Sequence, residues 1–291
     1  MSRGKFVYVI LHYNTVEDTR ACVGSIEEKL KGENYEIVIV DNGSPNGSGK
    51  EVMELFGNKE GIHVILNEKN EGFARGNNVG FRYAKYELKA DFIVLLNSDT
   101  LILHENTQRL AEGEYENSHC ALIGPKVRTP NLSFNVNRGP SKLPSLAILF
   151  RKQLTSYIYW LLSFINLDEY IHTHYGIEYK RQMKSLKSEI HEKRVENVQL
   201  HGCFWVFTPV FIERFDGLCD KTFLYCEEAI LFLRCLKSNL KTVYLPTIEI
   251  FHKEDSSTDS LMFNKPAKKR RFVYKYATAS TWVLIKEKLS K

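Results

Sequence analysis

Residues 92–100 read Phe-Ile-Val-Leu-Leu-Asn-Ser-Asp-Thr, an apolar run followed by a polar segment that carries one carboxylate. Because the run does not alternate with polar residues, it is typical of a strand buried on both faces of a parallel sheet. Asp99 is poorly suited to such a core. It is well placed just beyond the strand, where open α/β sheets bind ligands. The stretch therefore predicts an α/β fold in which Asp99 either belongs to a ligand site at the carboxyl edge of the sheet or caps a following helix.

Three similar apolar runs precede this one, separated by helix-like segments. They span Phe6–Leu11, Glu36–Val40 and His63–Leu66. Thr15 and Asp18 have the spacing of a capping box that opens a helix toward Leu30. A second helix is predicted over Arg75–Glu87. Strand–helix–strand units of this length predict a mostly parallel central sheet with flanking helices.

The rest of the chain divides into an insert, a second α/β segment and a tail. Prolines, an apolar aromatic stretch and a charged stretch predict that residues 129–198 form a mostly helical insert. The α/β pattern returns in residues 199–263. Residues 264–291 contain nine Lys or Arg and one Glu. The predicted organisation is thus a first half (1–128), an insert, a second half and a basic C-terminal helix.

Composition restricts the class of protein. The 291 residues are 43% hydrophobic and 26% charged, which excludes global disorder. The net charge of +5 is uneven: without the tail, 31 basic and 34 acidic side chains remain. Such a tail suits an anionic membrane, a nucleic acid or water. We expect no nucleic-acid partner, because no recognisable binding module accompanies the tail.

No signal peptide and no apolar run long enough to span a bilayer is evident in this sequence. The six cysteines form no CxxC pair. We therefore expect a reduced, cytoplasmic location.

Acidic residues follow several of the predicted strands or open a predicted helix. Asp41 ends the second run and is followed by Asn-Gly, which indicates either a ligand-binding carboxylate or a simple turn. Glu227 and Glu228 precede an apolar helix, where they are either general-base candidates or complements to the helix dipole. The glycines of residues 67–80 do not match GxGxxG, so a dinucleotide-binding fold is disfavoured.

Taken together and in order, these segments resemble the family 2 glycosyltransferases of GT-A fold, with the rhamnosyltransferase-like branch most similar. The resembling stretches are VILHYNT, EIVIVDNGS, LNEKNEGFARGNNVG, FIVLLNSDT, QLHGCFWVFTPVFIERFDG, KTFLYCEEAILFLR and VYLPTIEIFHKEDSST. They cover about residues 6–130 and 199–258.

The resemblance implies roles for particular residues. Those along the nucleotide-sugar site are Thr15, Asp41, Asn70, Gly72, Arg75, Asn78, Asn97 and Ser98. Asp99 and His252 would hold a divalent metal, Mn²⁺ or Mg²⁺, and His201 and Gly202 open the acceptor-binding segment. Glu228 matches the catalytic acid, with Glu227 before it.

Two departures from the family pattern bear on this assignment. The metal-binding DxD motif is Asn97-Ser98-Asp99, so one carboxylate is missing. The catalytic acid is a Glu where Asp is usual, so either Glu227 or Glu228 could be the base. The implied activity is inverting transfer of a hexosyl-type sugar from a UDP or dTDP donor to a glycan or polyprenyl-lipid-linked acceptor in polysaccharide biosynthesis. The alternative is a catalytically inactive nucleotide-sugar-binding or scaffold protein.

The tail suggests a peripheral contact with the inner face of the cell membrane. Val273, Tyr276, Ser280, Val283 and Leu284 approximate one helical face, and Trp282 lies close to it. A basic amphipathic helix of this kind suits anionic lipid. The apolar stretch Tyr157–Leu167 is a second candidate contact. The alternative is that the apolar stripe of the tail packs on the body of the protein.

Overall fold

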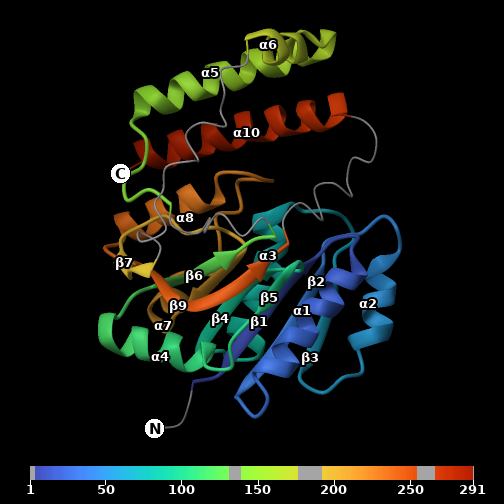
Figure 1. The fold of residues 1–291 in the computed structure, drawn as a ribbon, viewed down its shortest axis with the longest axis vertical. Helices are drawn as coiled ribbons and strands as arrows, with labels where there is room; N and C mark the ends of the chain where they lie inside the picture. The colour runs from blue at the N-terminus through green and yellow to red at the C-terminus, as the bar shows by residue number, and fades with distance from the viewer. Residues whose placement is uncertain (1–3, 131–138, 176–191, 254–265, 291) are drawn as a thin grey trace.

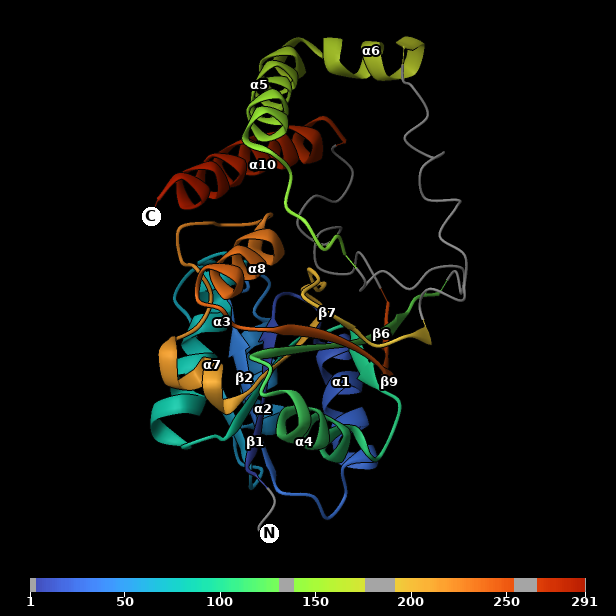
Figure 2. The ribbon, with the colours of Figure 1, turned by 90° about the vertical axis from the view of Figure 1, so that its left-hand side faces the viewer.

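The computed structural model describes residues 4–130, 139–175, 192–253 and 266–290. Figures 1 and 2 show a central sheet between helices, with a further pair of long helices stacked beyond one helical layer. In the described residues nine strands form one sheet of order β3-β2-β1-β4-β8-β6-β9-β5, and β7 pairs with β9. The strands are β1 (Phe6–His12), β2 (Tyr35–Asp41), β3 (Ile62–Leu66), β4 (Phe92–Asn97), β5 (Thr100–Ile102), β6 (Leu122–Arg128), β7 (Val195–Glu196), β8 (Phe204–Phe207) and β9 (Thr242–His252).

The first four strands along the chain, β1 to β4, run parallel, as the apolar runs predict. The remainder of the sheet is mixed. Strand β8 is antiparallel to β4 and to β6, whereas β6 and β9 are parallel. All four residues of β8 are buried. A strand buried on both faces has the same composition whether it runs parallel or antiparallel to its neighbours. The sequence pattern therefore did not show the direction of β8.

Two hydrophobic cores lie on the two faces of the sheet. In β1, Tyr8 and Ile10 contribute to the core that includes α1, α2 and α4, while Val7 and Val9 contribute to the core that includes α3, α7 and α8. The helices are α1 (Val16–Lys29), α2 (Ser48–Phe56), α3 (Phe73–Arg82), α4 (Thr107–Ser118), α5 (Leu146–Leu162), α6 (Leu167–Tyr175), α7 (Pro209–Arg214), α8 (Glu227–Lys237) and α10 (Pro266–Leu289), with a π-helical turn η1 (Tyr83–Glu87) and a 3₁₀ turn η2 (Ser163–Ile165).

The start of α1 differs in detail from the prediction. Thr15 is the N-cap residue, but its side chain makes no capping hydrogen bond. The Asp18 carboxylate instead accepts a hydrogen bond from Lys253 Nζ at 2.8 Å. The predicted capping box is therefore wrong, because Lys253, directly after β9, binds the Asp18 carboxylate that the box would need.

A third layer is formed by helices of the insert and the tail. Helices α5 and α10 lie side by side beyond α8 in both views (Figures 1 and 2). The core that α5 and α10 share with α8 contains Leu149, Ile230, Leu233, Leu284 and Ile285. The charged stretch of the insert over residues 176–191 lies outside the described residues. The tail helix is thus part of the folded body.

The apolar stripe predicted for the tail is largely used in this packing. Ser280 and Leu284 are buried, and Val283 packs against the shared core of α5, α8 and α10. The Tyr276 ring stacks on Phe223 with the ring centroids 4.5 Å apart. Of the residues on and beside the predicted stripe, Trp282 is exposed. The structure therefore favours the alternative in which the stripe packs on the body.

Candidate active site

A pocket of about 550 Å³ opens at the carboxyl ends of β1 and β4 and is closed on its other side by the start of α8. It is lined by Leu11, Tyr13, Phe73, Asn97, Ser98, Asp99, His201, Gly202, Cys203, Leu224, Tyr225, Glu227, Glu228 and His252. The pocket thus brings together the predicted metal, acceptor and catalytic residues with Asn97 and Ser98, although Asn97 and His252 are 155 positions apart in the chain.

One wall of the pocket carries Asp99 and His252. The pairing of β5 with β9 places Thr100 opposite His252, and this brings the preceding Asp99 to the imidazole. Asp99 Oδ1 lies 3.2 Å from His252 Nε2, and both side chains are buried. Asn97 Nδ2 lies 3.4 Å from the same ring nitrogen. An amide that contacts His252 therefore stands where the family motif has a second acid.

The pair has the chemistry of a partial divalent-metal site. A carboxylate oxygen and an imidazole nitrogen are both ligands of Mn²⁺, and His252 Nδ1 is buried without a hydrogen-bond partner. In the described parts of the chain no group of three or more His, Cys, Asp or Glu side chains could hold a metal. Asp99 and His252 could thus supply two ligands to a divalent metal, which would need further oxygen ligands from outside the protein.

The part of the lining before α8 contains an unusual turn. Tyr225 and Cys226 have φ angles of 75° and 68°, the left-handed region that residues with a Cβ seldom adopt. Helix α10 supports this turn, because Ser280 Oγ donates a hydrogen bond to Leu224 O at 2.7 Å. The turn starts α8 at Glu227, so that Glu227 and Glu228 both reach the pocket.

The two glutamates have different environments. Glu228 Oε1 accepts a hydrogen bond from the backbone N–H of Gly202 at 3.3 Å, which ties α8 to the predicted acceptor segment. Glu227 is buried, and its Oε1 has no hydrogen-bond partner. Burial raises the pKa of Glu227 to about 7, and the neighbouring Glu228 carboxylate also raises it. A carboxyl group with a pKa raised in this way is a common feature of catalytic sites.

Glu227 is expected to make folding stability depend on pH. Its folded-state pKa of about 7 exceeds the ordinary value, so its contribution is full below about pH 4.5 and is lost as the pH rises through about 7. The loss is at most about 3 kcal/mol. Urea unfolding between about pH 5 and about pH 8 should therefore show a smaller fall in stability for Glu227→Gln than for the wild type. Equal slopes for the two proteins would contradict this assignment.

A second pocket of about 480 Å³ adjoins the first, since Tyr13 lines both. Asp41 and Asn70, two of the predicted nucleotide-sugar residues, line it. The Asp41 carboxylate is nearly buried and accepts a hydrogen bond from Ser44 Oγ at 2.5 Å. Asp41 therefore organises the turn after β2, as the turn alternative predicts, and it also lines the second pocket.

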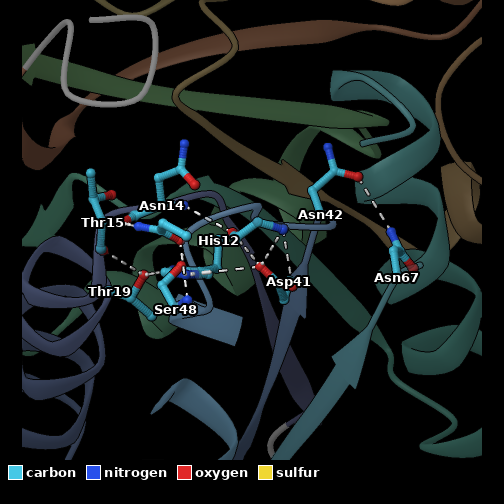
Figure 3. Close-up of polar contacts among 10 residues, drawn as sticks. His12, Asn14, Thr15, Thr19, Asp41, Asn42, Ser48 and Asn67 are labelled. Atoms are coloured by element: carbon cyan, nitrogen blue, oxygen red, sulfur yellow. Dashed lines mark hydrogen bonds and ion pairs between the residues drawn. The ribbon is translucent and has the colours of Figure 1, made fainter. Parts of the chain in front are cut away.

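Behind Asp41, the buried His12 connects three elements (Figure 3). Its Nδ1 lies 2.7 Å from Thr19 Oγ1, and its Nε2 lies 2.9 Å from Ser48 Oγ. Burial lowers the pKa of His12, against the opposing effect of Asp41, so the ring is neutral at neutral pH. Because the Thr19 hydroxyl donates to Thr15 O, the network assigns the ring proton to Nδ1 and makes Nε2 the acceptor from Ser48.

Asn42 is an important residue that the sequence reasoning treated only as part of a turn. It is buried, and its Nδ2 donates to Asn70 Oδ1 and to Gly72 O, both at 3.1 Å. Its Oδ1 accepts from the backbone N–H of Glu71 and from Asn67 Nδ2. Asn42 therefore holds the loop between β3 and α3. The signal available in the sequence was its position directly after Asp41, at the end of a parallel strand.

The glycines of residues 72–80 serve packing. A Cβ on Gly72 would lie 2.3 Å from Phe223 O, and one on Gly80 would lie 2.3 Å from a Val9 methyl group. The N–H of Phe73 donates to Phe223 O at 2.7 Å. At the start of α3, the close approach to the backbone is thus made by the chain itself. Glycines at intervals of four share a helix face, which fits this role equally well.

Three other predicted nucleotide-sugar residues lie away from the two pockets. Both polar atoms of the Asn78 side-chain amide bond to the backbone of Leu218. Oδ1 accepts from the Leu218 N–H at 2.6 Å, and Nδ2 donates to Leu218 O at 3.0 Å. Arg75 donates to Asp220 O at 2.8 Å and lines a separate surface depression. Thr15 stands at the start of α1, beside the His12 network. The hydrogen bonds of the Asn78 and Arg75 side chains are structural ones, whereas Thr15 Oγ1 is buried without a hydrogen-bond partner.

The fold and the site together define the class of protein. Four parallel strands lead to a pocket that is lined by an acid–histidine pair and by a pair of acids. This is the arrangement of a glycosyltransferase of GT-A fold. Residues 8–191 match the sequence pattern of the family described as "Glycosyl transferase family 2". The chain belongs to this family.

Comparisons with individual proteins agree with this classification. The chain is 22% identical over 268 residues to the "Low-salt glycan biosynthesis hexosyltransferase Agl10" of Haloferax volcanii, covering 92% of this chain and 70% of that protein. It is 31% identical over 97 residues to the "dTDP-rhamnosyl transferase RfbF" of Shigella flexneri, covering 33% of this chain and 31% of that protein.

Among solved structures, GalNAc-T7 with UDP, GalNAc and Mn²⁺ has the same fold, with a TM-score of 0.58 and 13% identity. The match covers 88% of this chain and 45% of that one.

Proposed function

We propose that this protein is an inverting, metal-dependent glycosyltransferase of the hexosyltransferase type. It transfers a sugar from a UDP- or dTDP-linked donor to a hydroxyl of a glycan or a polyprenyl-lipid-linked saccharide in polysaccharide biosynthesis. The observation that carries the proposal is the single pocket lined by Asp99 and His252 together with Glu227 and Glu228. Similarity to a glycan-building hexosyltransferase and to a dTDP-rhamnosyl transferase supports the substrate class.

The two adjoining pockets match the two ends of the donor. The base and ribose fit the pocket lined by Asp41 and Asn70, and the diphosphate extends past Tyr13 toward Asn97–Asp99 in the other. Asp99 and His252 would hold Mn²⁺ or Mg²⁺ there. A divalent cation at this position would neutralise the charge that develops on the leaving diphosphate.

Glu228 is the proposed general base. It accepts the proton of the acceptor hydroxyl, whose oxygen bonds to the anomeric carbon while the bond to the diphosphate breaks on the opposite face. The N–H of Gly202 orients the Glu228 carboxylate, and His201 lies beside it on the proposed acceptor side. Because donor, acceptor and base must be aligned, much of the rate enhancement comes from positioning.

We place the enzyme in the cytoplasm, in peripheral contact with the inner face of the cell membrane. A polyprenyl-linked acceptor is confined to the bilayer, and the C-terminal segment carries nine basic residues and one acidic one. Basic segments are attracted to anionic lipid surfaces.

A donor screen tests the proposal. UDP- and dTDP-sugars should raise the melting temperature in the presence of Mn²⁺ and much less in EDTA, because ligand binding stabilises the folded state. A donor concentration of about 100 times Kd stabilises the folded state by about 2.7 kcal/mol. Binding without transfer to any acceptor would support the inactive, nucleotide-sugar-binding alternative. No response to any nucleotide sugar would contradict both.

A further inference from the structure

Helix α5 and the turn η2 present a row of apolar side chains to solvent. Leu154, Ile158, Leu161 and Ile165 follow one another at spacings of three and four residues and are between 45% and 71% exposed. Tyr157 and Phe164 are exposed beside them. Scattered exposed apolar residues are ordinary, but a continuous row on one helix face marks an interaction surface. We call these six residues the α5 row.

The α5 row does not belong to the core of the protein. The opposite face of α5 packs on α10: Leu149 lies in their shared core, and the rings of Tyr159 and Tyr274 are 5.8 Å apart. In both views α10 lies between α5 and the remainder of the protein (Figures 1 and 2). The α5 row is therefore the outer face of the outermost layer.

The charges around the α5 row are of one sign. Residues 117–167 contain no Asp or Glu. Arg151 and Lys152 are exposed on α5, and Lys268 and Lys275 are exposed on α10. The first acids after the row, Asp168 and Glu169, both accept hydrogen bonds from Arg270. A helical layer that exposes an apolar row together with basic side chains complements a surface that is apolar inside and anionic outside.

We propose that the α5 row is the surface through which this protein lies on an anionic lipid bilayer. The proposal rests on the membrane contact proposed above and identifies its location. Among the helices of the described residues, none combines the length and the apolarity needed to span a membrane, so the contact is interfacial. The apolar stripe of α10 is packed inside, so α10 supplies cations to this surface and α5 supplies the apolar side chains.

The position of the row also connects the bilayer to the active site. Helix α10 contacts α5 on one side, and on the other it donates the Ser280 hydroxyl to the pocket turn at Leu224. One helix therefore separates the proposed lipid surface from the turn that carries Glu227 and Glu228. This suits an acceptor whose lipid stays in the bilayer while its saccharide enters the pocket.

Sedimentation with vesicles tests the proposal, using full-length protein and phosphatidylcholine vesicles with or without phosphatidylglycerol. The triple variant Leu154→Gln, Ile158→Gln and Leu161→Gln should lower partitioning on the order of 100-fold. The variant Arg151→Gln, Lys152→Gln should lower it on the order of fivefold per charge at low salt, and less at high salt. The matched control Met53→Gln, Leu236→Gln removes exposed apolar side chains elsewhere and should partition like the wild type.

Two further measurements separate the possible failures. Equal partitioning of the triple variant and the wild type, or wild-type dimers that the triple variant abolishes without any vesicle binding, would overturn the proposal. The second result would assign the row to another copy of the chain. Donor-induced melting shifts, measured on the same samples, should be equal in all variants. If the wild type binds donor but not vesicles, the surface assignment fails and the proposed donor-binding site is unaffected.

Discussion

Replacing Glu228 by glutamine is expected to lower the rate of sugar transfer roughly 10²–10⁴-fold, with donor binding nearly unchanged. Glutamine keeps the size of the side chain and an oxygen that can accept the Gly202 N–H, but it lacks basicity. Steady-state transfer kinetics should therefore show a fall in kcat, while titration with the nucleotide sugar gives a similar Kd.

The adjacent Glu227 provides the matched comparison for this result. Its carboxyl group is more buried than that of Glu228, and its pKa is raised to about 7 by that burial. Both groups line the same pocket, so geometry alone does not separate them. If Glu227→Gln abolished transfer and Glu228→Gln retained near-normal activity, the base would be Glu227.

Replacing Asp99 by alanine is expected to abolish metal-dependent donor binding. Asp99 is the carboxylate of the Asn97-Ser98-Asp99 segment and lies 3.2 Å from His252. Metal stabilisation of a diphosphate is worth several kcal/mol, so the affinity in Mn²⁺ should fall on the order of 100-fold or more. Calorimetric titration with UDP- or dTDP-sugar, with and without Mn²⁺, measures the effect.

Asp99→Asn controls for the structural role of this buried side chain. It retains the shape and a hydrogen-bonding oxygen beside His252, so its melting temperature should be closer to that of the wild type than Asp99→Ala. It should nevertheless bind donor equally with Mn²⁺ and with EDTA. Full wild-type activity in EDTA would show instead that transfer does not need the metal.

The parallel half of the fold was predictable because its signals are local. Each of the first four strands is a short apolar run, and the strands of the structure match the predicted runs to within one residue at each end. Asp99 and the two glutamates were recognisable for a related reason. Carboxylates beside apolar segments have few roles in packing, so their positions indicated a site.

Other features depend on partners distant in the chain. The stripe of α10 has the same pattern whether it faces lipid or protein, and only the presence of α8 and α5 shows that it is packed. Asn78 reads as a polar residue in a ligand-binding segment, but its amide is bonded to Leu218, 140 positions away. Neither outcome follows from residue type, because each depends on which surface the fold brings near.

By itself, the sequence determined the α/β class, the first four strands and which acids gather at their carboxyl ends, since hydrophobic pattern and strand direction act over a few residues. The tertiary structure decided the antiparallel insertion of β8, the meeting of Asp99 with His252 through the β5–β9 register, and the support of the Glu227 turn by α10. These are long-range contacts between segments whose own composition allows several partners. Their choice is made by the burial and hydrogen bonding that only the assembled layers provide.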